Sequence, residues 1–168
     1  MSITNLLYKD VQYNTWVAEQ LVNWLQTIPE QQLQKEIPSS FTSMAKTLKH
    51  INDTQLYWST LIKDVPVPEF EYMPTHVDVT VELQNLVEEA ELLEQYVKEH
   101  YVDMQENLLI ESQWFTSNFP KYEYLQHLII HTTYHRGQMI TIGHNIQAPK
   151  APMLDFNFWN VITQQNES

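Results

Sequence analysis

The chain has 168 residues, and 9 Lys and Arg against 21 Asp and Glu give it a formal charge of −12 at neutral pH. This length is typical of one domain, so we expect a single domain over residues 1–168 with a substantial core. An acidic chain repels phosphate backbones and anionic lipids, so we expect no nucleic-acid partner and no membrane partner. Without cysteine, any bound metal must be held by nitrogen and oxygen ligands.

The N-terminus lacks the basic start and apolar run of a secretory signal, and no segment approaches the ~18 apolar residues of a membrane span. We therefore expect a cytoplasmic protein. Glycine is scarce, with 2 residues where average usage of ~7% would give about 12. Few glycines allow few tight turns with positive φ, which favours long helices over hairpin-rich β structure.

Prolines separate four long segments, of which the first two have clear helical periodicity. Residues 1–28 repeat apolar side chains at spacings of three and four, which is typical of one buried helix face. Asn14 is the one polar member of this stripe. Residues 40–62 follow the same pattern, and Ser39 or Ser40 can supply the N-cap. These segments predict the first two helices.

The other two long segments predict two more helices. Residues 80–101 carry an apolar stripe with acidic residues on the opposite, solvated side. Residues 120–146 begin with Pro120, which is favoured in the first turn of a helix, and keep one stripe to their end.

The remaining segments connect or follow these helices. Residues 103–119 show no helical period, and the prolines of residues 65–74 favour extended chain, so both are expected to be crossovers. A short aromatic helix within residues 153–164 is expected to cap the open end of the bundle. The sequence thus predicts an all-α four-helix bundle with one or two long connections and a short C-terminal helix.

Histidines carry the clearest chemical signal. His127, His131 and His135 are four residues apart, and each step of four drifts only about 40° around a helix, so the three imidazoles share a face. An i, i+4 pair of neutral imidazoles can converge on one metal ion, and His50 is the other histidine placed in mid-helix. Spacing alone leaves two interpretations open, a metal site or a buried face of hydrogen-bonded histidines.

Other hydrolytic chemistries have no signature in the chain. No glutamate lies between His131 and His135, where a zinc protease keeps its general base. No Ser-His-Asp motif is evident, and two glycines cannot build the usual phosphate-binding loop.

Three segments resemble a known family. Residues 131–138 read HTTYHRGQ, which is similar to the HxxxHRGQ signature of the DinB/YfiT-like superfamily of metalloproteins. Residues 13–16 resemble the YNxW element of that family, and residues 40–51 resemble its second-helix pattern. The resemblance spans roughly residues 5–146, with the segments in the family's order.

The resemblance implies an up-down-down-up bundle in which His50, His131 and His135 bind one divalent ion, zinc or nickel, with water at the open positions. It places His127 beside the site as a neighbour. Thr42 stands where the family often has glycine, and we expect this departure to affect the start of the second helix more than the metal.

Relatives with known activities include thiol S-transferases and isomerases, so the resemblance implies a small-molecule substrate and a low-molecular-weight thiol of the bacillithiol type. Three neutral imidazoles leave a divalent ion strongly Lewis acidic, able to lower the pKa of bound water from about 15.7 to about 7 and to activate a thiol likewise. The expected function is a metal-dependent S-transferase or hydrolase. The alternative is a non-catalytic, metal-stabilised protein with a structural or ligand-binding role, which a fourth protein ligand would favour.

Four further residues are expected near the histidines. Asp53 is one turn from His50 and is a candidate fourth ligand or a hydrogen-bond acceptor for an imidazole. Tyr57 and Tyr134 are candidates for orienting a substrate, and Gln138 for hydrogen bonding a ligand imidazole.

Two residues of the signature are expected to be structural. Arg136 points about 100° away from His135 and is expected to pair with a carboxylate on another helix. Gly137 is expected to allow close helix packing. Relatives often form dimers, so a homodimer through the first helix or the aromatic tail helix is also expected.

Overall fold

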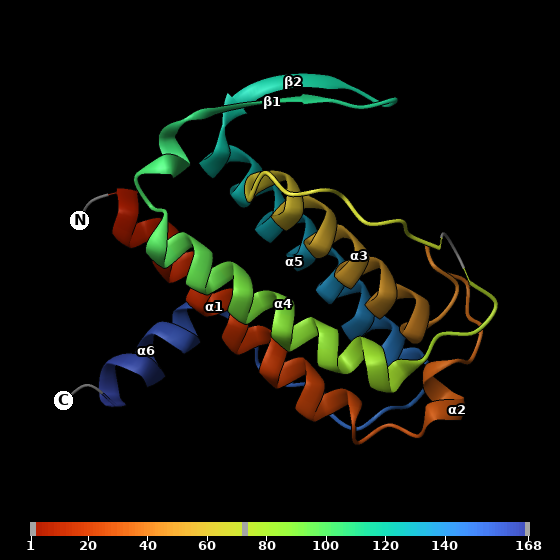
Figure 1. Cartoon of the computed structure of the whole chain (residues 1–168). Helices are drawn as coiled ribbons and strands as arrows, with labels where there is room; N and C mark the ends of the chain where they lie inside the picture. Colours follow the sequence, from red (N-terminus) through yellow and green to blue (C-terminus); the bar gives the residue numbers. More distant parts are fainter. Residues whose placement is uncertain (1–2, 72–73, 167–168) are drawn as a thin grey trace.

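The computed structural model describes residues 3–71 and 74–166. Four long helices form its body, and α1 contacts α4 while α3 contacts both α4 and α5. The helices α3 and α4 run in one direction and α1 and α5 in the other (Figure 1). The predicted all-α, up-down-down-up bundle with a short C-terminal helix is therefore confirmed. The long helices are α1 (Ile3–Leu25), α3 (Met44–Ile62), α4 (Val79–Glu99) and α5 (Lys121–Asn145).

Shorter elements connect and follow the long helices. Among the described residues, no helix is both long and apolar enough to cross a membrane. The shorter elements are α2 (Glu30–Leu33), the 3₁₀ helix η1 (Asp103–Gln105), the strands β1 (Asn107–Glu111) and β2 (Thr116–Pro120), and α6 (Phe156–Asn166).

The start of α3 differs from the prediction. Its N-cap is Ser43, not Ser39 or Ser40, and the Ser43 side chain accepts a hydrogen bond from the Lys46 backbone N–H at 3.1 Å. The preceding residue, Thr42, has a φ of 59°. A left-handed backbone costs a residue with a Cβ roughly 1–2 kcal/mol, which is the physical reason that glycine suits this position.

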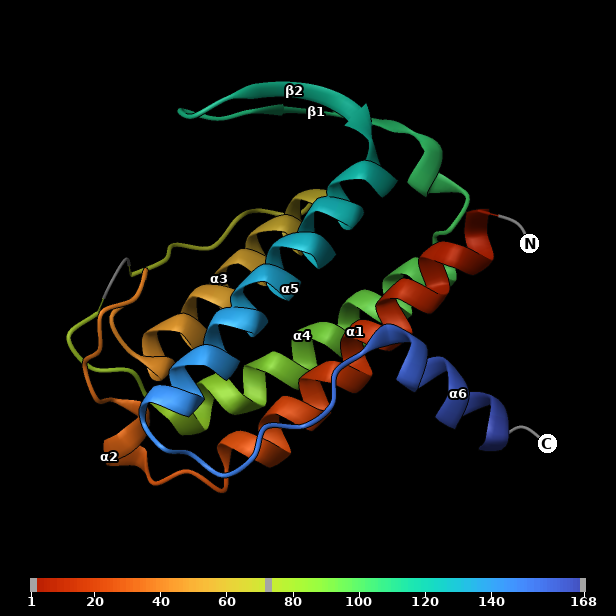
Figure 2. The same cartoon turned by 180° about the vertical axis from the view of Figure 1, so that it is seen from behind.

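The segment expected to be an irregular crossover, residues 103–119, instead contains η1 and an antiparallel hairpin. The register pairs Asn107 with Pro120 and Glu111 with Thr116. In Figures 1 and 2 the hairpin lies over the α3 and α5 side of the bundle. Its loop needs no glycine, because none of residues 112–115 has a positive φ. Ser112 Oγ accepts hydrogen bonds from two backbone N–H groups of the loop, at 3.2 and 3.1 Å. Glycine scarcity was therefore no guide to this hairpin.

The C-terminal helix α6 does not cap the open end of the bundle as expected. It lies against the side of α1 (Figure 2), where the Tyr13 ring packs against Phe156 and Trp159 with centroids 5.0 and 5.8 Å apart. Trp159 is buried, whereas Phe156 and Phe158 remain 37% and 41% exposed. The aromatic residues are thus only partly covered in one chain.

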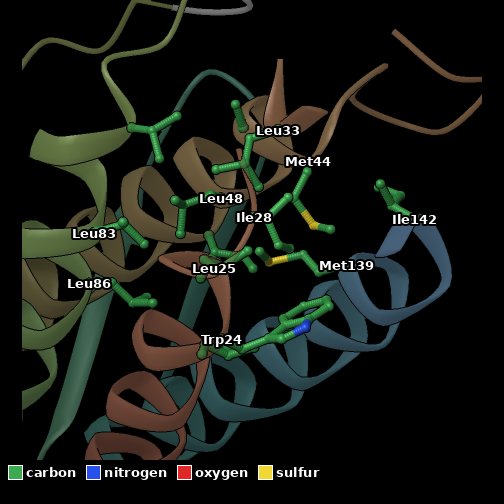
Figure 3. Close-up of a cluster of buried hydrophobic side chains, with 14 of the residues drawn as sticks. Trp24, Leu25, Ile28, Leu33, Met44, Leu48, Leu83, Leu86, Met139 and Ile142 are labelled. Atoms are coloured by element: carbon green, nitrogen blue, oxygen red, sulfur yellow. The ribbon is translucent and has the colours of Figure 1, made fainter. Parts of the chain in front are cut away.

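Close packing at the α2 end of the bundle depends on Gly143 rather than Gly137. Figure 3 shows Trp24, Met44 and Met139 meeting in the core there. A Cβ on Gly143 would lie 2.7 Å from the Trp24 ring. A Cβ on Gly137 would have no neighbour within 4 Å, so the packing role expected for Gly137 is wrong.

A buried polar network joins three helices. Arg136, 3% exposed, donates from Nη2 to Asn14 Oδ1 at 2.6 Å, and Asn14 Nδ2 donates to Gln55 Oε1 at 3.2 Å. The expected carboxylate partner of Arg136 is therefore replaced by an amide. Burial lowers the pKa of Arg136 to about 10, so the guanidinium still carries its charge at neutral pH.

Candidate metal centre

Three histidines from two helices converge at one point. His50 comes from α3, and His131 and His135 come from successive turns of α5. His135 Nε2 lies 3.1 Å from His50 Nε2 and 3.2 Å from His131 Nε2. In the part of the chain that the structure describes, this is the one group of three or more His, Asp or Glu residues whose ligand atoms lie within 4.8 Å of one another.

These separations fit ligands of a single ion. Tetrahedral zinc with Zn–N bonds of about 2.0–2.1 Å places its nitrogen ligands about 3.3–3.4 Å apart. The observed separations of 3.1 and 3.2 Å are within a few tenths of an ångström of that value. The donor set of three imidazoles also suits nickel, because ligand type does not separate these two ions.

Hydrogen bonding directs one imidazole lone pair into the cluster. His135 Nδ1 lies 2.8 Å from Gln138 Oε1, and an amide oxygen can only accept, so the His135 proton is on Nδ1. Its Nε2 lone pair then faces the nitrogens of His50 and His131. One lone pair cannot accept from both neighbours, whereas a cation between the three nitrogens would satisfy them all.

The imidazoles are neutral at physiological pH. Burial first, and then the neighbouring imidazoles, lower the pKa of His50 and of His131 to about 4. Burial also lowers the pKa of His135, against the opposing effect of its hydrogen bond to Gln138. Neutral imidazole is the form that ligates a metal, so no proton has to be displaced near neutral pH.

An aromatic ring covers the cluster. Phe41 stacks on His50 with ring centroids 4.0 Å apart and presents an edge to His135 at 5.4 Å. Phe41 was not predicted to be a site residue, although it lies in the segment that resembles the family's second-helix pattern. Its contact with both helices restricts the imidazole orientations and excludes water from one side.

The other residues that were expected near the histidines make different contacts. Asp53 makes no hydrogen bond to an imidazole within the described residues and instead accepts from Lys49 Nζ at 2.8 and 3.0 Å. Burial raises the pKa of Asp53, while Lys49 opposes the rise. His127 lies beside the cluster, with its ring 4.7 Å from Trp58. Tyr134 is 63% exposed, although its ring lies 5.0 Å from that of His135.

A large cavity opens beside the histidines. It has a volume of about 930 Å³ and a mostly apolar lining, and His50 and His131 form part of its wall. Tyr57 and Trp58 of α3 line it, together with Val67, Pro68 and Phe70 of the connection and residues 112–114 of the hairpin loop. Its size is within the ordinary range of small-molecule sites. We call it the apolar cavity.

The sequence pattern that defines the DinB family matches residues 1–150. The chain belongs to the DinB family. The protein DinB of Bacillus subtilis (strain 168) is 22% identical over 173 residues, covering 99% of this chain and 100% of that protein. A crystal structure of a DinB-like protein from Bacillus subtilis shares the fold, with a TM-score of 0.65 and 14% identity over 89% of this chain and 98% of that one.

Some site residues of this DinB chain had no signal in the sequence. Residues 112–114 reach the apolar cavity because the hairpin folds over α3 and α5. The strands that carry this loop are five residues long each, which is too short for a reliable periodic pattern. The histidines were found because helical spacing and the family signature agree.

Proposed function

We propose that the chain is a metal-dependent enzyme that binds a small-molecule substrate in the apolar cavity and transforms it beside His50, His131 and His135. The observation that supports this most strongly is a convergent set of neutral nitrogen donors at the wall of an apolar cavity of about 930 Å³. A few convergent polar groups at the wall of a largely apolar, concave space are the usual arrangement of a catalytic site.

The three imidazoles would hold one divalent ion, zinc or nickel. Such an ion supplies Lewis acidity, which lowers the pKa of a thiol or water that reaches it. Among the described residues, no fourth His, Asp or Glu joins the cluster. Structural zinc sites normally have four protein ligands, whereas catalytic sites keep a position free. The three-donor set therefore favours catalysis over a purely structural metal.

The surrounding side chains would orient the reaction. Gln138 fixes the tautomer of His135, and Phe41 shields the histidines from water on one side. Burial raises the pKa of Tyr57, so its hydroxyl is protonated at neutral pH and can donate a hydrogen bond within the apolar cavity. Exclusion of water strengthens each of these electrostatic interactions.

Thiol transfer is the reaction that we propose first, with hydrolysis second. The chain has no cysteine, so the sulfur must come from a low-molecular-weight thiol. In the transfer, the sulfur forms a bond to an electrophilic carbon of the second substrate. The leaving group departs with the electrons of the broken bond, and the thiol proton passes to solvent.

The test compares metal-free protein with protein reconstituted with zinc or nickel. Bacillithiol with monochlorobimane reports thiol transfer, and 4-nitrophenyl acetate reports hydrolysis. We expect turnover that depends on the metal, falls at least a hundredfold in His135→Ala and is unchanged in His100→Ala. Equal turnover with and without metal would refute the proposal. Stoichiometric metal without turnover of either kind would favour the alternative, a non-catalytic, metal-stabilised ligand-binding or structural bundle.

A further inference from the structure

Aromatic rings from three parts of the chain line the apolar cavity. Tyr57 and Trp58 come from α3, Phe70 from the connection between α3 and α4, and Trp114 from the loop between β1 and β2. An apolar lining alone favours every apolar molecule. The partners that each ring already has therefore decide what the cavity can select.

The ring of Trp58 forms a fixed wall at one end of the cavity. Trp58 is 9% exposed and stacks with Phe115 and Tyr124, with ring centroids 6.1 and 5.7 Å apart. The rings of Tyr57 and His127 meet it at steep angles, with centroids 5.4 and 4.7 Å away. A ring held by so many neighbours keeps one orientation, so it offers a bound molecule a constant surface.

The indole of Trp114 is the opposite case. It is 72% exposed on the hairpin loop, and in the described chain it belongs to no aromatic ring pair, although its neighbour Phe115 packs on Trp58. Its ring surface is therefore left in water at the wall of the cavity. A bound aromatic molecule would cover this surface and form a ring pair, which contributes more than the buried area alone.

The aromatic end of the cavity is separated from the histidine end. His50 and Trp58 are eight positions apart on α3, which is about 12 Å along the helix axis. Because α5 runs in the opposite direction (Figure 1), it is His127, one turn before His131, that meets Trp58. A ring at Trp58 therefore lies about two helical turns from the histidines, and a chain of several bonds must bridge the gap.

The polar groups beside the rings favour an uncharged molecule. Among the described residues that line the cavity, none is a lysine or arginine, and the carboxylate of Asp53 already accepts from Lys49. The hydroxyl and amide groups there belong to Thr54, Tyr57, Ser112 and Gln113. An ionised ligand loses hydration in an apolar space and needs a counter-ion, which these side chains do not supply.

We propose that the apolar cavity selects an uncharged aromatic substrate whose ring packs against Trp114 and Trp58, at the end of the cavity away from the histidines. This substrate class rests on the proposed function in taking the molecule in the cavity as the substrate. A saturated ring of similar shape would occupy the same space without forming the ring pairs.

The test measures how binding depends on aromaticity. The probes are 4-phenylbutan-1-ol and 4-cyclohexylbutan-1-ol, titrated by calorimetry against the wild type and Trp114→Leu as purified. The ratio of their dissociation constants is compared between the two proteins, so the greater hydrophobicity of the cyclohexyl ring cancels. Trp114→Leu should shift this ratio about fivefold towards the cyclohexyl probe, which is equivalent to about 1 kcal/mol for one ring pair.

The matched control is Phe119→Leu. Phe119 is also an exposed aromatic residue of the hairpin, but it does not line the cavity, so its replacement should leave the ratio unchanged. The large exposure of Trp114 means that Trp114→Leu should fold normally. A wild-type ratio in Trp114→Leu, an equal shift in Phe119→Leu, or binding of neither probe by the wild type would overturn the proposal.

One further variant tests the charge preference and separates the proposal from the metal. His135→Ala should lose the metal, keep the wild-type ratio, and bind 4-phenylbutanoate several times more weakly than the alcohol. A ratio that changes with loss of the metal, or equal binding of the anion, would overturn the proposal. If the ratio is kept while the wild type shows no metal-dependent turnover, the proposed function fails and the aromatic site stands. Metal-dependent turnover with an unchanged ratio in Trp114→Leu would refute this substrate class alone.

Discussion

Thr42 holds a backbone conformation that its own side chain opposes. Its φ is 59°, and its hydroxyl accepts a 3.4 Å hydrogen bond from Lys46. Thr42→Gly removes the left-handed penalty but adds flexibility to the unfolded chain, so we expect a net rise of up to about 1 kcal/mol in the free energy of unfolding. Urea unfolding measures it. Thr42→Ala controls for the hydroxyl and should show no gain, and a less stable glycine variant would contradict the interpretation.

The two glycines of α5 should respond oppositely to alanine. Gly143→Ala places a methyl group 2.7 Å from the Trp24 ring and should destabilise the protein by about 1–3 kcal/mol through overpacking. Gly137→Ala meets nothing within 4 Å and should stabilise by up to about 1 kcal/mol through helix propensity. Thermal unfolding of both variants compares them. A similar loss of stability in both variants would contradict the different amounts of free space that the structure gives the two glycines.

At the scale of elements, the hairpin forms one wall of the apolar cavity, and Trp114 is the largest side chain that it places there. This side chain is 72% exposed, so Trp114→Ala should change the free energy of unfolding by no more than about 0.5 kcal/mol. It should nevertheless weaken binding of 4-phenylbutan-1-ol by severalfold and leave the metal content intact. Leu109→Ala, on the same hairpin but outside the cavity lining, is the control. Unaltered binding in Trp114→Ala would show that the hairpin loop does not contribute to the binding site.

The elements that sequence predicts well are those whose fold is encoded locally. The four long helices carry periodic apolar stripes, and their bounds fall within about four residues of the predicted ones. The position of α6 depends on which surface of α1 is free, and this is a tertiary property that no local pattern encodes. Arg136 is similar: helical geometry predicts that it points away from His135, but its partner Asn14 follows only from the packing.

The site divides in the same way. The histidines on α5 share a face by spacing alone, and His50 was a candidate from its position in mid-helix. The family resemblance then selected His50, His131 and His135, which the structure brings together. Side-chain pairing around the histidines is less predictable, because spacing does not decide between neighbours on one helix. Asp53 was expected at an imidazole, and it is found with Lys49, one turn earlier on α3.

At the scale of the whole molecule, the histidine cluster should make the metal-free protein sensitive to acid. The pKa of His50 and of His131 is about 4 in the fold, against an ordinary 6.5, so between these values the unfolded chain binds more protons than the native one. The free energy of unfolding should therefore be greatest above about pH 6.5 and fall as the pH drops towards 4. Raised carboxyl pKa values, as at Asp10, act in the opposite direction.

Urea unfolding at pH 7.0, 5.5 and 4.5 after treatment with a chelator measures this dependence. The double variant His50→Gln and His131→Gln should be less sensitive, because glutamine does not titrate. An identical loss of stability in the wild type and the double variant would assign acid sensitivity to other groups.

The most direct test of the account is elemental analysis of untagged protein, with His50→Ala and His127→Ala measured alongside the wild type. His50 is in the convergent set, whereas His127 packs on Trp58 beside it. We predict about one zinc or nickel ion per chain in the wild type and in His127→Ala, and none in His50→Ala. A wild type that takes up no metal even after reconstitution, or a His50→Ala variant that retains it, would contradict a metal centre built across α3 and α5.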